Sequence, residues 1–432
     1  MFRNLFSKIE NLFFYLFIFC LPFQTRLFLF GRKDFFNEWS AGFLYLSDLL
    51  LLALLCFWAW RIFRQKEKPV FKDWRLETIL GVFWGLAGIS IFQALETPLA
   101  VFGFLKLTEL LLLFFYLKHS FCRFAGEKAF FVFLLAAVFQ GALGLAQFFK
   151  QKDLGLKLLG ESPLGADIPG VAKVELAGEK VIRAYGALPH PNLLGVLMFL
   201  ALIFFLAYIL KRGFKTWQIA PLGIIFGGLF LSFSRLAIFV FAVSFLVLFV
   251  WGLTRKVSRR RALGTLCLLA VFFFLFFGLA GEAARSRFDV SQIKDSQSVD
   301  LRKHYAQIGW EMFKQRPFGV GINSFTAGFI DDFKRLGLPV ENWMFQPIHN
   351  LYFLIAVETG FIGLVVFLWF LVEIFRRLWR VKEGLAKIVF WPVFLSFLFL
   401  GFFDHYFWTL QQGQLLFWGL LGIIAGYDPD PS

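Results

Sequence analysis

The feature that most constrains this chain is a run of about 20 apolar residues that recurs along almost its whole length. A helix needs roughly 20 such residues to cross the hydrocarbon core of a bilayer, so each run predicts one transmembrane helix. Hydrophobic residues make up 59% of the 432 residues, and 65 Phe exceed what a water-soluble core would bury. The sequence therefore predicts an all-α polytopic membrane protein. About twelve spans are expected, near residues 11–30, 40–60, 76–95, 99–117, 129–149, 192–210, 219–234, 236–253, 263–280, 350–371, 388–404 and 409–426.

The distribution of Lys and Arg predicts how these spans are oriented. Loops that remain in the cytoplasm carry an excess of basic residues, and only short loops count for this rule. The loops expected on one side hold 24 basic residues, whereas the short loops opposite hold Arg26, Arg32, Lys33 and Arg235. Both termini are therefore expected in the cytoplasm. The net charge of +15 then reflects topology, and we expect no nucleic-acid partner.

Two long loops fall on the extracytoplasmic side, and both exceed ordinary connections in length. The N-terminal segment lacks a small-residue cleavage site, so it is expected to be a first membrane helix and not a removed signal peptide. The second loop contains a predicted helix at 300–315, ended by Arg316-Pro317. The predicted units are helices 1–5 (1–149), the first long loop (150–191), helices 6–9 (192–280), the second long loop (281–349), and helices 10–12 with a short cytoplasmic tail (350–432).

Three residues with reactive chemistry are far apart in sequence but are all expected on the outer side. Arg235 lies between two apolar spans where only a tight turn fits, and Arg183 lies just before the sixth span. Each guanidinium either extends to the lipid headgroups or binds an anion such as phosphate, for which its planar fork is suited. His349 precedes the tenth span. It is either a helix cap or surface residue, or a general base that accepts a proton near neutral pH.

Four further polar residues lie at the outer ends of predicted spans. Asn192 follows Pro191 and is expected to be the N-cap of the sixth helix, with His190 beside it. Asp404 and His405 end the eleventh span, where they line a pocket or simply lie at the interface. The sequence alone leaves these two alternatives open.

Charged residues also occur inside predicted spans. Lys106 and Glu109 are three residues apart in the fourth span and are expected to form an ion pair, while Asp48 in the second span has no assignable partner. The four cysteines have no metal-binding spacing, and we find no Gly-rich nucleotide loop. We therefore expect neither a metal nor a cofactor.

The residues that follow His349 form a specific pattern. His349 and Asn350 are followed by nine residues and Gly360, then two residues and Gly363. This matches the pattern H-[NSQ]-x9-G-x-x-[GTY] of the O-antigen ligase and polymerase superfamily of membrane glycosyltransferases. The chain resembles that superfamily from about residue 180 to its C-terminus.

Three other segments resemble the same superfamily in the same order. They are RAYG with HPN at 183–192, SFSR at 232–235 and RPFGVGINSF at 316–325. The resemblance implies a GT-C-like helical fold in a bacterial inner membrane, with the active site facing the periplasm. It implies transfer of a glycan from a polyprenyl (undecaprenyl) diphosphate carrier to a lipid or polymer acceptor hydroxyl, with inversion and without metal or nucleotide.

The resemblance also implies roles for individual residues. His349 would deprotonate the acceptor hydroxyl, and Arg183 and Arg235 would bind the diphosphate. The remaining residues expected at the substrate site are His190, Asn192, Asn350, Asp404 and His405.

Several functions stay open at this point. The full histidine pattern favours a ligase, but the sequence does not separate a ligase from a repeat-unit polymerase or a protein O-oligosaccharyltransferase. A transporter or flippase for polyprenyl-linked glycans would also need many helices and an anion site. Transporters, however, place their charges near the bilayer midplane on broken helices.

Overall fold

The computed structural model describes residues 2–31, 36–65, 74–124, 126–176, 179–288, 297–335, 341 and 344–427. It is about 77% helical, in agreement with the predicted class. The predicted outer basic residues Arg32 and Lys33 lie outside the described residues. Among these residues, eight helices are long and apolar enough to cross a membrane. They are α2 (Leu46–Gln65), α3 (Trp74–Ser90), α4 (Thr97–Phe124), α5 (Glu127–Lys150), α6 (Pro191–Arg212), α8 (Arg235–Thr254), α9 (Lys256–Phe288) and α13 (Leu351–Arg380).

Four other apolar helices coincide with the remaining predicted spans. They are α1 (Phe2–Cys20), α7 (Ile219–Leu231), α14 (Leu385–Gly401) and α16 (Gln411–Gly426). Each of the twelve predicted spans therefore overlaps one helix of the structure. Since only eight helices in the described part of the chain have the length and composition of a span, a total of twelve membrane crossings stays a prediction.

The boundaries of the first two predicted spans are wrong. Helix α1 ends at Cys20, just before Pro22, whose ring nitrogen has no hydrogen to donate to a continuing helix. The chain then forms β1 (Arg26–Gly31), which pairs antiparallel with β2 (Ala41–Tyr45). Short apolar runs do not distinguish strand from helix, and the alternating Leu and Phe of β1 suit a strand.

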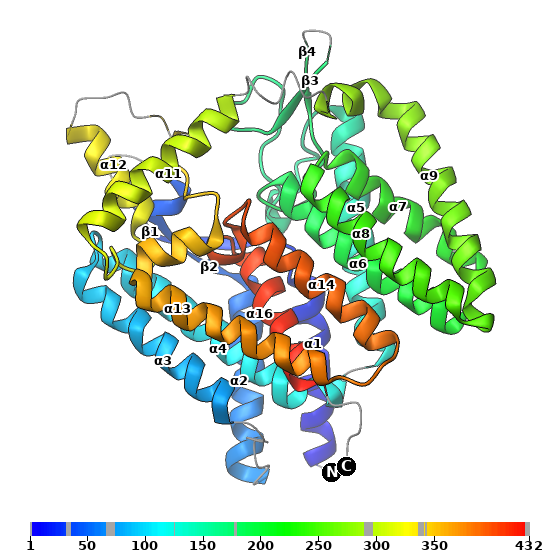
Figure 1. The fold of residues 1–432 in the computed structure, drawn as a ribbon, viewed down its shortest axis with the longest axis horizontal. Helices are drawn as coiled ribbons and strands as arrows, with labels where there is room; N and C mark the ends of the chain where they lie inside the picture. The colour runs from blue at the N-terminus through cyan, green and yellow to red at the C-terminus, as the bar shows by residue number, and fades with distance from the viewer. Residues whose placement is uncertain are drawn as a thin grey trace.

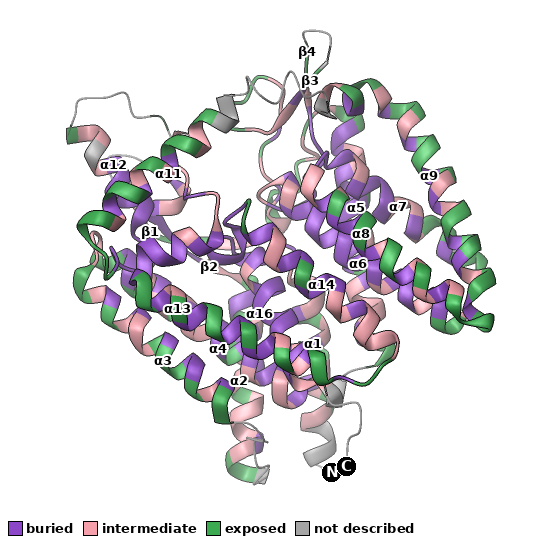
Figure 2. Cartoon of the chain, in the orientation of Figure 1, coloured by how far each residue is buried: buried purple, intermediate pink, exposed green. Residues whose placement is uncertain are grey.

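The helices form two groups that are visible in Figure 1. Helices α3, α4, α13 and α16 contact one another in one group, and α5 to α9 form the other. Helix α1 contacts α2 and α5, and α14 contacts α8 and α13, so both connect the groups. Figure 2 shows that α6 is buried along most of its length, whereas α9 exposes much of its surface. An exposed apolar face of this kind suits contact with lipid.

The two long connections cover one end of the helices. The first contains η3 (Lys157–Leu159) and the hairpin of β3 (Lys173–Leu176) and β4 (Glu179–Ile182). The second contains α11 (Gln297–Gln315), which confirms the helix predicted at 300–315, and α12 (Phe325–Arg335).

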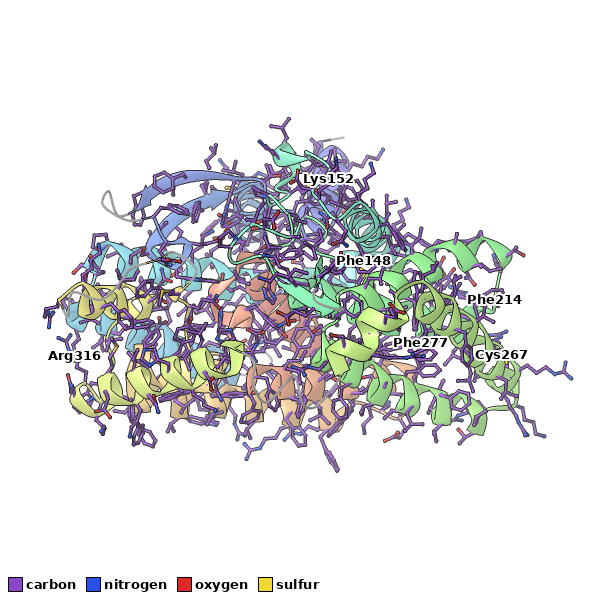
Figure 3. All side chains as sticks on the ribbon, turned by 90° about the horizontal axis from the view of Figure 1, so that it is seen from above. Phe148, Lys152, Phe214, Cys267, Phe277 and Arg316 are labelled. Atoms are coloured by element: carbon purple, nitrogen blue, oxygen red, sulfur yellow. The ribbon has the colours of Figure 1, made fainter. Side chains whose placement is uncertain are left out.

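Seen from above, the molecule is elongated (Figure 3). Arg316, at the end of α11, and Cys267, in α9, lie at opposite ends, with Phe148 of α5 between them. The connection between α14 and α16, which contains α15 (Tyr406–Thr409), runs through the middle of the molecule in Figure 1.

Candidate active site

The structure brings together polar residues from three separate connections. His349 and Asn350 precede α13, Asp404 and His405 lie between α14 and α15, and Asn192 lies in the first turn of α6. The reactive nitrogen and oxygen atoms of His349, Asp404 and His405 lie within 4.8 Å of one another. These three residues are the candidates for catalysis, and we call them the catalytic cluster.

Asn350 fixes the start of α13 next to this cluster. Its side-chain oxygen accepts a hydrogen bond from the backbone N–H of Phe353 at 2.9 Å, which makes Asn350 the N-cap of the helix. Its side-chain nitrogen donates to the carbonyl of Phe402 at 3.2 Å. Asn350 therefore joins the start of α13 to the connection that carries Asp404 and His405.

A break in α13 explains the glycine of the histidine pattern. Gly360 has a φ of 79°, in the left-handed region that favours glycine, and it interrupts the helix. The backbone groups released by this break bind the connection before α12. The N–H of Val320 donates to the carbonyl of Val357 at 2.9 Å, and the N–H of Phe361 donates to that of Pro317 at 3.1 Å. The glycines of both motifs therefore hold this connection against the helix that positions His349.

His349 is placed by aromatic contacts and not by hydrogen bonds. Its ring lies edge-on to that of His405, with centroids 4.8 Å apart, and is stacked on Tyr305 at 6.0 Å. Neither ring nitrogen forms a hydrogen bond with a described residue, and Nδ1 is fully buried. Burial holds the pKa of His349 well below its usual value, so the imidazole is neutral at neutral pH and able to accept a proton.

Asp404 is the ionised member of the catalytic cluster. Its Oδ1 accepts a hydrogen bond from the backbone N–H of His405 at 2.9 Å, and its Oδ2 accepts one from Asn192 at 3.1 Å. Burial raises the pKa of this carboxyl, but attraction to the cluster histidines and to Arg302 outweighs that effect and lowers the pKa to about 2. The carboxylate is therefore positioned to stabilise positive charge on a neighbouring imidazole.

His405 is the more constrained of the two histidines. Its Nδ1 lies 2.6 Å from the hydroxyl of Thr409, and its ring meets the edge of Trp39 at 5.1 Å. Burial lowers its pKa to about 4, against the attraction of Asp404. Because one nitrogen of His405 is already engaged, His349 is the freer base of the pair.

Arg183 connects the cluster to the turn that precedes α8. Its guanidinium donates from Nε to the carbonyl of Ser232 at 2.7 Å and from a terminal nitrogen to the side-chain oxygen of Asn192 at 2.8 Å. The side-chain nitrogen of Asn192 in turn donates to Asp404, so a continuous chain of hydrogen bonds runs from Arg183 through Asn192 to the carboxylate. We call this chain the relay. This arrangement orients Asp404 and brings a buried positive charge towards it.

The predicted N-cap of α6 is wrong. The cap is His190, whose Nδ1 accepts from the backbone N–H of Asn192 at 3.1 Å, and Pro191 occupies the first helical position, which it favours. The Asn192 amide is thereby left to form the relay. Burial, with the charge of Arg183, lowers the pKa of His190 to about 3.

Arg235 begins α8, directly after a tight turn in which Phe233 has a φ of 45°. Its side chain is partly exposed and forms no hydrogen bond or ion pair with a described residue. The tight turn predicted at this position is confirmed.

Arg302 is a residue that the sequence reasoning missed. It lies on α11, and its charge acts on His349, Asp404, His405 and Arg235. Like Arg235, it forms no hydrogen bond or ion pair within the described part of the chain. The sequence could have pointed to Arg302 as a site residue, because it lies in the helix predicted at 300–315, within the long loop that ends at His349.

Lys106, Glu109 and Asp48, three charged residues inside the spans, form one network. Lys106 contacts Glu109 at 3.3 Å, as predicted, and also pairs with Asp48. Asp48 also accepts hydrogen bonds from the side chain of Gln411 at 2.5 Å and from the backbone N–H of Tyr45 at 2.8 Å. Lys106 comes from α4 and Gln411 from α16, so sequence spacing alone did not reveal them as partners of Asp48.

Two imidazoles and a carboxylate also form a donor set that a divalent metal ion accepts. Sequence spacing did not reveal this set, because its members lie on separate connections. Both oxygens of Asp404 already accept hydrogen bonds, and Arg302 acts on all three residues. The surroundings therefore fit an acid–base cluster better than a site for a divalent cation.

Comparison with protein families gives one match. Residues 220–368, about a third of the chain, match the family model described as O-antigen ligase. This match supports the assignment of the chain to the O-antigen ligase and polymerase superfamily. No curated protein matches the chain.

The O-antigen ligase match covers only part of the site. It includes Arg235, Arg302 and His349, whereas Arg183 and Asp404 lie outside it. The carboxylate of the catalytic cluster and the relay that orients it are therefore contributed by parts of the chain outside the match.

Proposed function

We propose that the protein transfers a glycan from a polyprenyl diphosphate carrier to an acceptor hydroxyl on the extracytoplasmic face of a bacterial inner membrane. The observation that carries this proposal is the neutral His349 beside the ionised Asp404, with Arg183 joined to Asp404 through Asn192 and with Arg302 close enough for its charge to act on both. The charge of Arg302 also acts on Arg235. A base and an anion site in one place are what glycosyl transfer from a diphosphate requires.

The arginines supply the charge that the donor needs. A diphosphate leaving group gains negative charge as it departs, and guanidinium groups stabilise it with paired hydrogen bonds. Arg235 and Arg302 have donors that no described residue uses, so they are the direct ligands. Arg183 adds a buried positive charge while it holds Asn192 in place. This assignment adds Arg302 to the two arginines expected from the sequence.

The reaction then proceeds by one displacement. The acceptor oxygen attacks the anomeric carbon as His349 takes the hydroxyl proton, and the bond from that carbon to the diphosphate oxygen breaks. The configuration at the anomeric carbon inverts. Asp404 stabilises the imidazolium that forms on His349. The proton leaves to water after the product has dissociated, and no metal or nucleotide takes part.

The proposed orientation follows from the charged loops. The cytoplasmic side holds both termini and the basic loops, and the catalytic cluster faces the periplasm. The polyprenyl tail lies between helices within the bilayer, where its apolar surface needs no polar partner.

The proposal is tested with purified protein and a polyprenyl diphosphate-linked repeat unit in the presence of EDTA. Free polyprenyl diphosphate and the sizes of the glycan products are measured, with candidate acceptors added in parallel. Transfer only to an added acceptor identifies a ligase, and a ladder of lengths without one identifies a polymerase. If the donor crosses liposomes intact and no carrier is released, the protein is a transporter and the proposal is wrong.

The role of His349 is tested in the same assay. His349→Ala should abolish transfer while the donor still binds, because the arginines remain. Gln307→Ala, at an exposed position of α11, is the control and should behave as wild type. Equal loss of donor binding in His349→Ala would count against a base.

A further inference from the structure

Glu358 is a buried acidic residue that the proposed reaction does not use. It lies in α13, two residues before the break at Gly360, and only 3% of it is exposed. Its carboxylate accepts hydrogen bonds from three described residues, and all three lie in other elements of the fold. Because a buried carboxyl without partners would be strongly destabilising, these three bonds are what make its burial tolerable.

Two of the donors belong to the start of α12. The backbone N–H of Asn323 donates to Oε2 of Glu358 at 2.9 Å. The N–H of Phe325, the first residue of α12, donates to Oε1 at 3.4 Å. The first N–H groups of a helix have no partner within it, and its N-terminus carries a partial positive charge, so a carboxylate suits this place. Glu358 therefore fastens α12 to α13, together with the connection that leads to it from α11, the helix of Arg302.

The third donor belongs to α15. The indole N–H of Trp408 donates to Oε2 of Glu358 at 2.7 Å. Trp408 is buried, and its backbone N–H donates to the carbonyl of His405 at 2.9 Å. The next residue, Thr409, places its hydroxyl 2.6 Å from Nδ1 of His405. The position of Trp408 therefore sets the position of the groups that hold His405.

These attachments make Glu358 a link between two connections that build the site. The connection from α11 to α12 follows the helix of Arg302, and the connection from α14 to α16 carries Asp404 and His405. Because every partner of Glu358 is an N–H donor, the arrangement suits the ionised carboxylate, which only accepts. Hydrogen bonds to a charged group are roughly twice as strong as those between neutral groups. Neither connection can shift without breaking one of these bonds.

We propose that Glu358 is a positioning residue that holds the two connections of the site together. Its bond to Trp408 keeps α15 in place, and with it the catalytic cluster around His405. Glu358 acts through these neighbours and does not touch the substrates. The inference rests on the proposed transferase function, and it assigns a role to one of the nine unspecified positions of the histidine pattern.

The link is tested first with Trp408→Phe, in the full chain in lipid nanodiscs. This variant keeps a ring and removes only the N–H donor, and Glu358 retains both backbone donors, so the protein should fold. The rate of polyprenyl diphosphate release is divided by the number of donor-binding sites, so that unfolded protein does not count. By this measure kcat should fall roughly 10- to 100-fold, the value of one hydrogen bond to a charged group, while the KM for the donor changes by less than twofold.

Glu358→Gln tests the same link from the other side. A side-chain amide has one accepting oxygen, so it cannot serve donors at both positions and at least one attachment is lost. The value of kcat should fall here as well. The double variant should lose less than the product of the two single losses, because both substitutions act on one link.

Trp391→Phe and Glu373→Gln are the matched controls. Trp391 lies on α14, and its indole N–H forms no hydrogen bond with a described residue. Glu373 is buried towards the other end of α13, where it pairs with Arg376 at 3.4 Å. Both controls should keep kcat within twofold of wild type.

Hydrogen exchange measures the link without the reaction. The backbone N–H groups of residues 405–410 should exchange faster in Trp408→Phe and at the wild-type rate in Trp391→Phe. If kcat per binding site or this exchange stays at the wild-type value in Trp408→Phe, the inference is wrong. A rise in KM as large as the fall in kcat, or a variant that binds no donor, would show a role in donor binding or in the fold and would also overturn it. Absence of carrier release with wild type would instead refute the transferase.

Discussion

Replacing Asp404 with Asn tests the catalytic cluster most directly, because the substitution removes one charge and almost no volume. The imidazole of His349 lies within 4.8 Å of the carboxylate. At an effective dielectric constant of about 20, two unit charges at that distance attract by about 3.5 kcal/mol. If Asp404 stabilises an imidazolium in the transition state, its loss should lower kcat by roughly 300-fold.

Asp404→Asn should also cost stability. Both carboxylate oxygens accept hydrogen bonds, from Asn192 and from the backbone of His405. An amide accepts at only one position, so one buried N–H loses its partner, at a cost of about 1–3 kcal/mol. The melting temperature should fall by a few degrees, and the assay must be run well below it.

The assay is release of polyprenyl diphosphate as a function of pH, because a purely structural role would not move the pH profile. Asp404 raises the pKa of His349, so Asp404→Asn should shift the acidic limb of kcat to lower pH while it lowers the plateau. Asp300→Asn, which removes an exposed ion pair on α11, is the control. A folded Asp404→Asn variant with kcat within threefold of wild type would refute the reasoning.

Four further predictions follow from the same structure. Arg302→Ala should weaken donor binding roughly 10- to 100-fold, measured by titration with polyprenyl diphosphate, and Arg302→Lys should restore only part of it. Gly360→Ala should destabilise the protein by more than about 2 kcal/mol, seen as a lower melting temperature, because its φ is 79° and a Cβ would lie 2.6 Å from the carbonyl carbon of Phe318. Glycan transfer should continue in the presence of EDTA. A loss of transfer that added Mg²⁺ or Mn²⁺ restores would contradict the metal-free mechanism. Burial lowers the pKa of His405 to about 4, so protonation of the unfolded chain should reduce stability as pH falls from roughly 6.5 towards 4, measured by thermal melting.

The membrane class and most helix positions could be predicted from the sequence. Each of the twelve apolar runs overlaps a helix, because apolar length and period are local properties of the chain. The first two boundaries were wrong for the same reason, since the apolar residues 27–30 suit a strand as well as a helix. What decided between them was pairing with β2, which lies ten residues further along the chain.

The candidate site could be predicted only in part. The motif around His349 is contiguous, so its residues could be named from spacing. Arg302 was missed because its helix carries no motif, and only the fold brings its charge to the cluster. Asn192 was named as a cap and as a substrate-site residue, but a local pattern cannot reveal that its amide bridges Arg183 and Asp404.

The sequence by itself therefore determined that this is a membrane protein, where most of its helices lie, and the histidine motif. These features depend on hydropathy and on glycine and proline positions, which are local properties of a few neighbouring residues. Only the tertiary structure decided which charges share a site. Asn192 and Asp404 are 212 residues apart, and Asp48 and Gln411 are 363 apart. Contacts over such separations depend on how buried helices pack against one another. That packing is set by the shapes of many side chains together, which no single segment encodes.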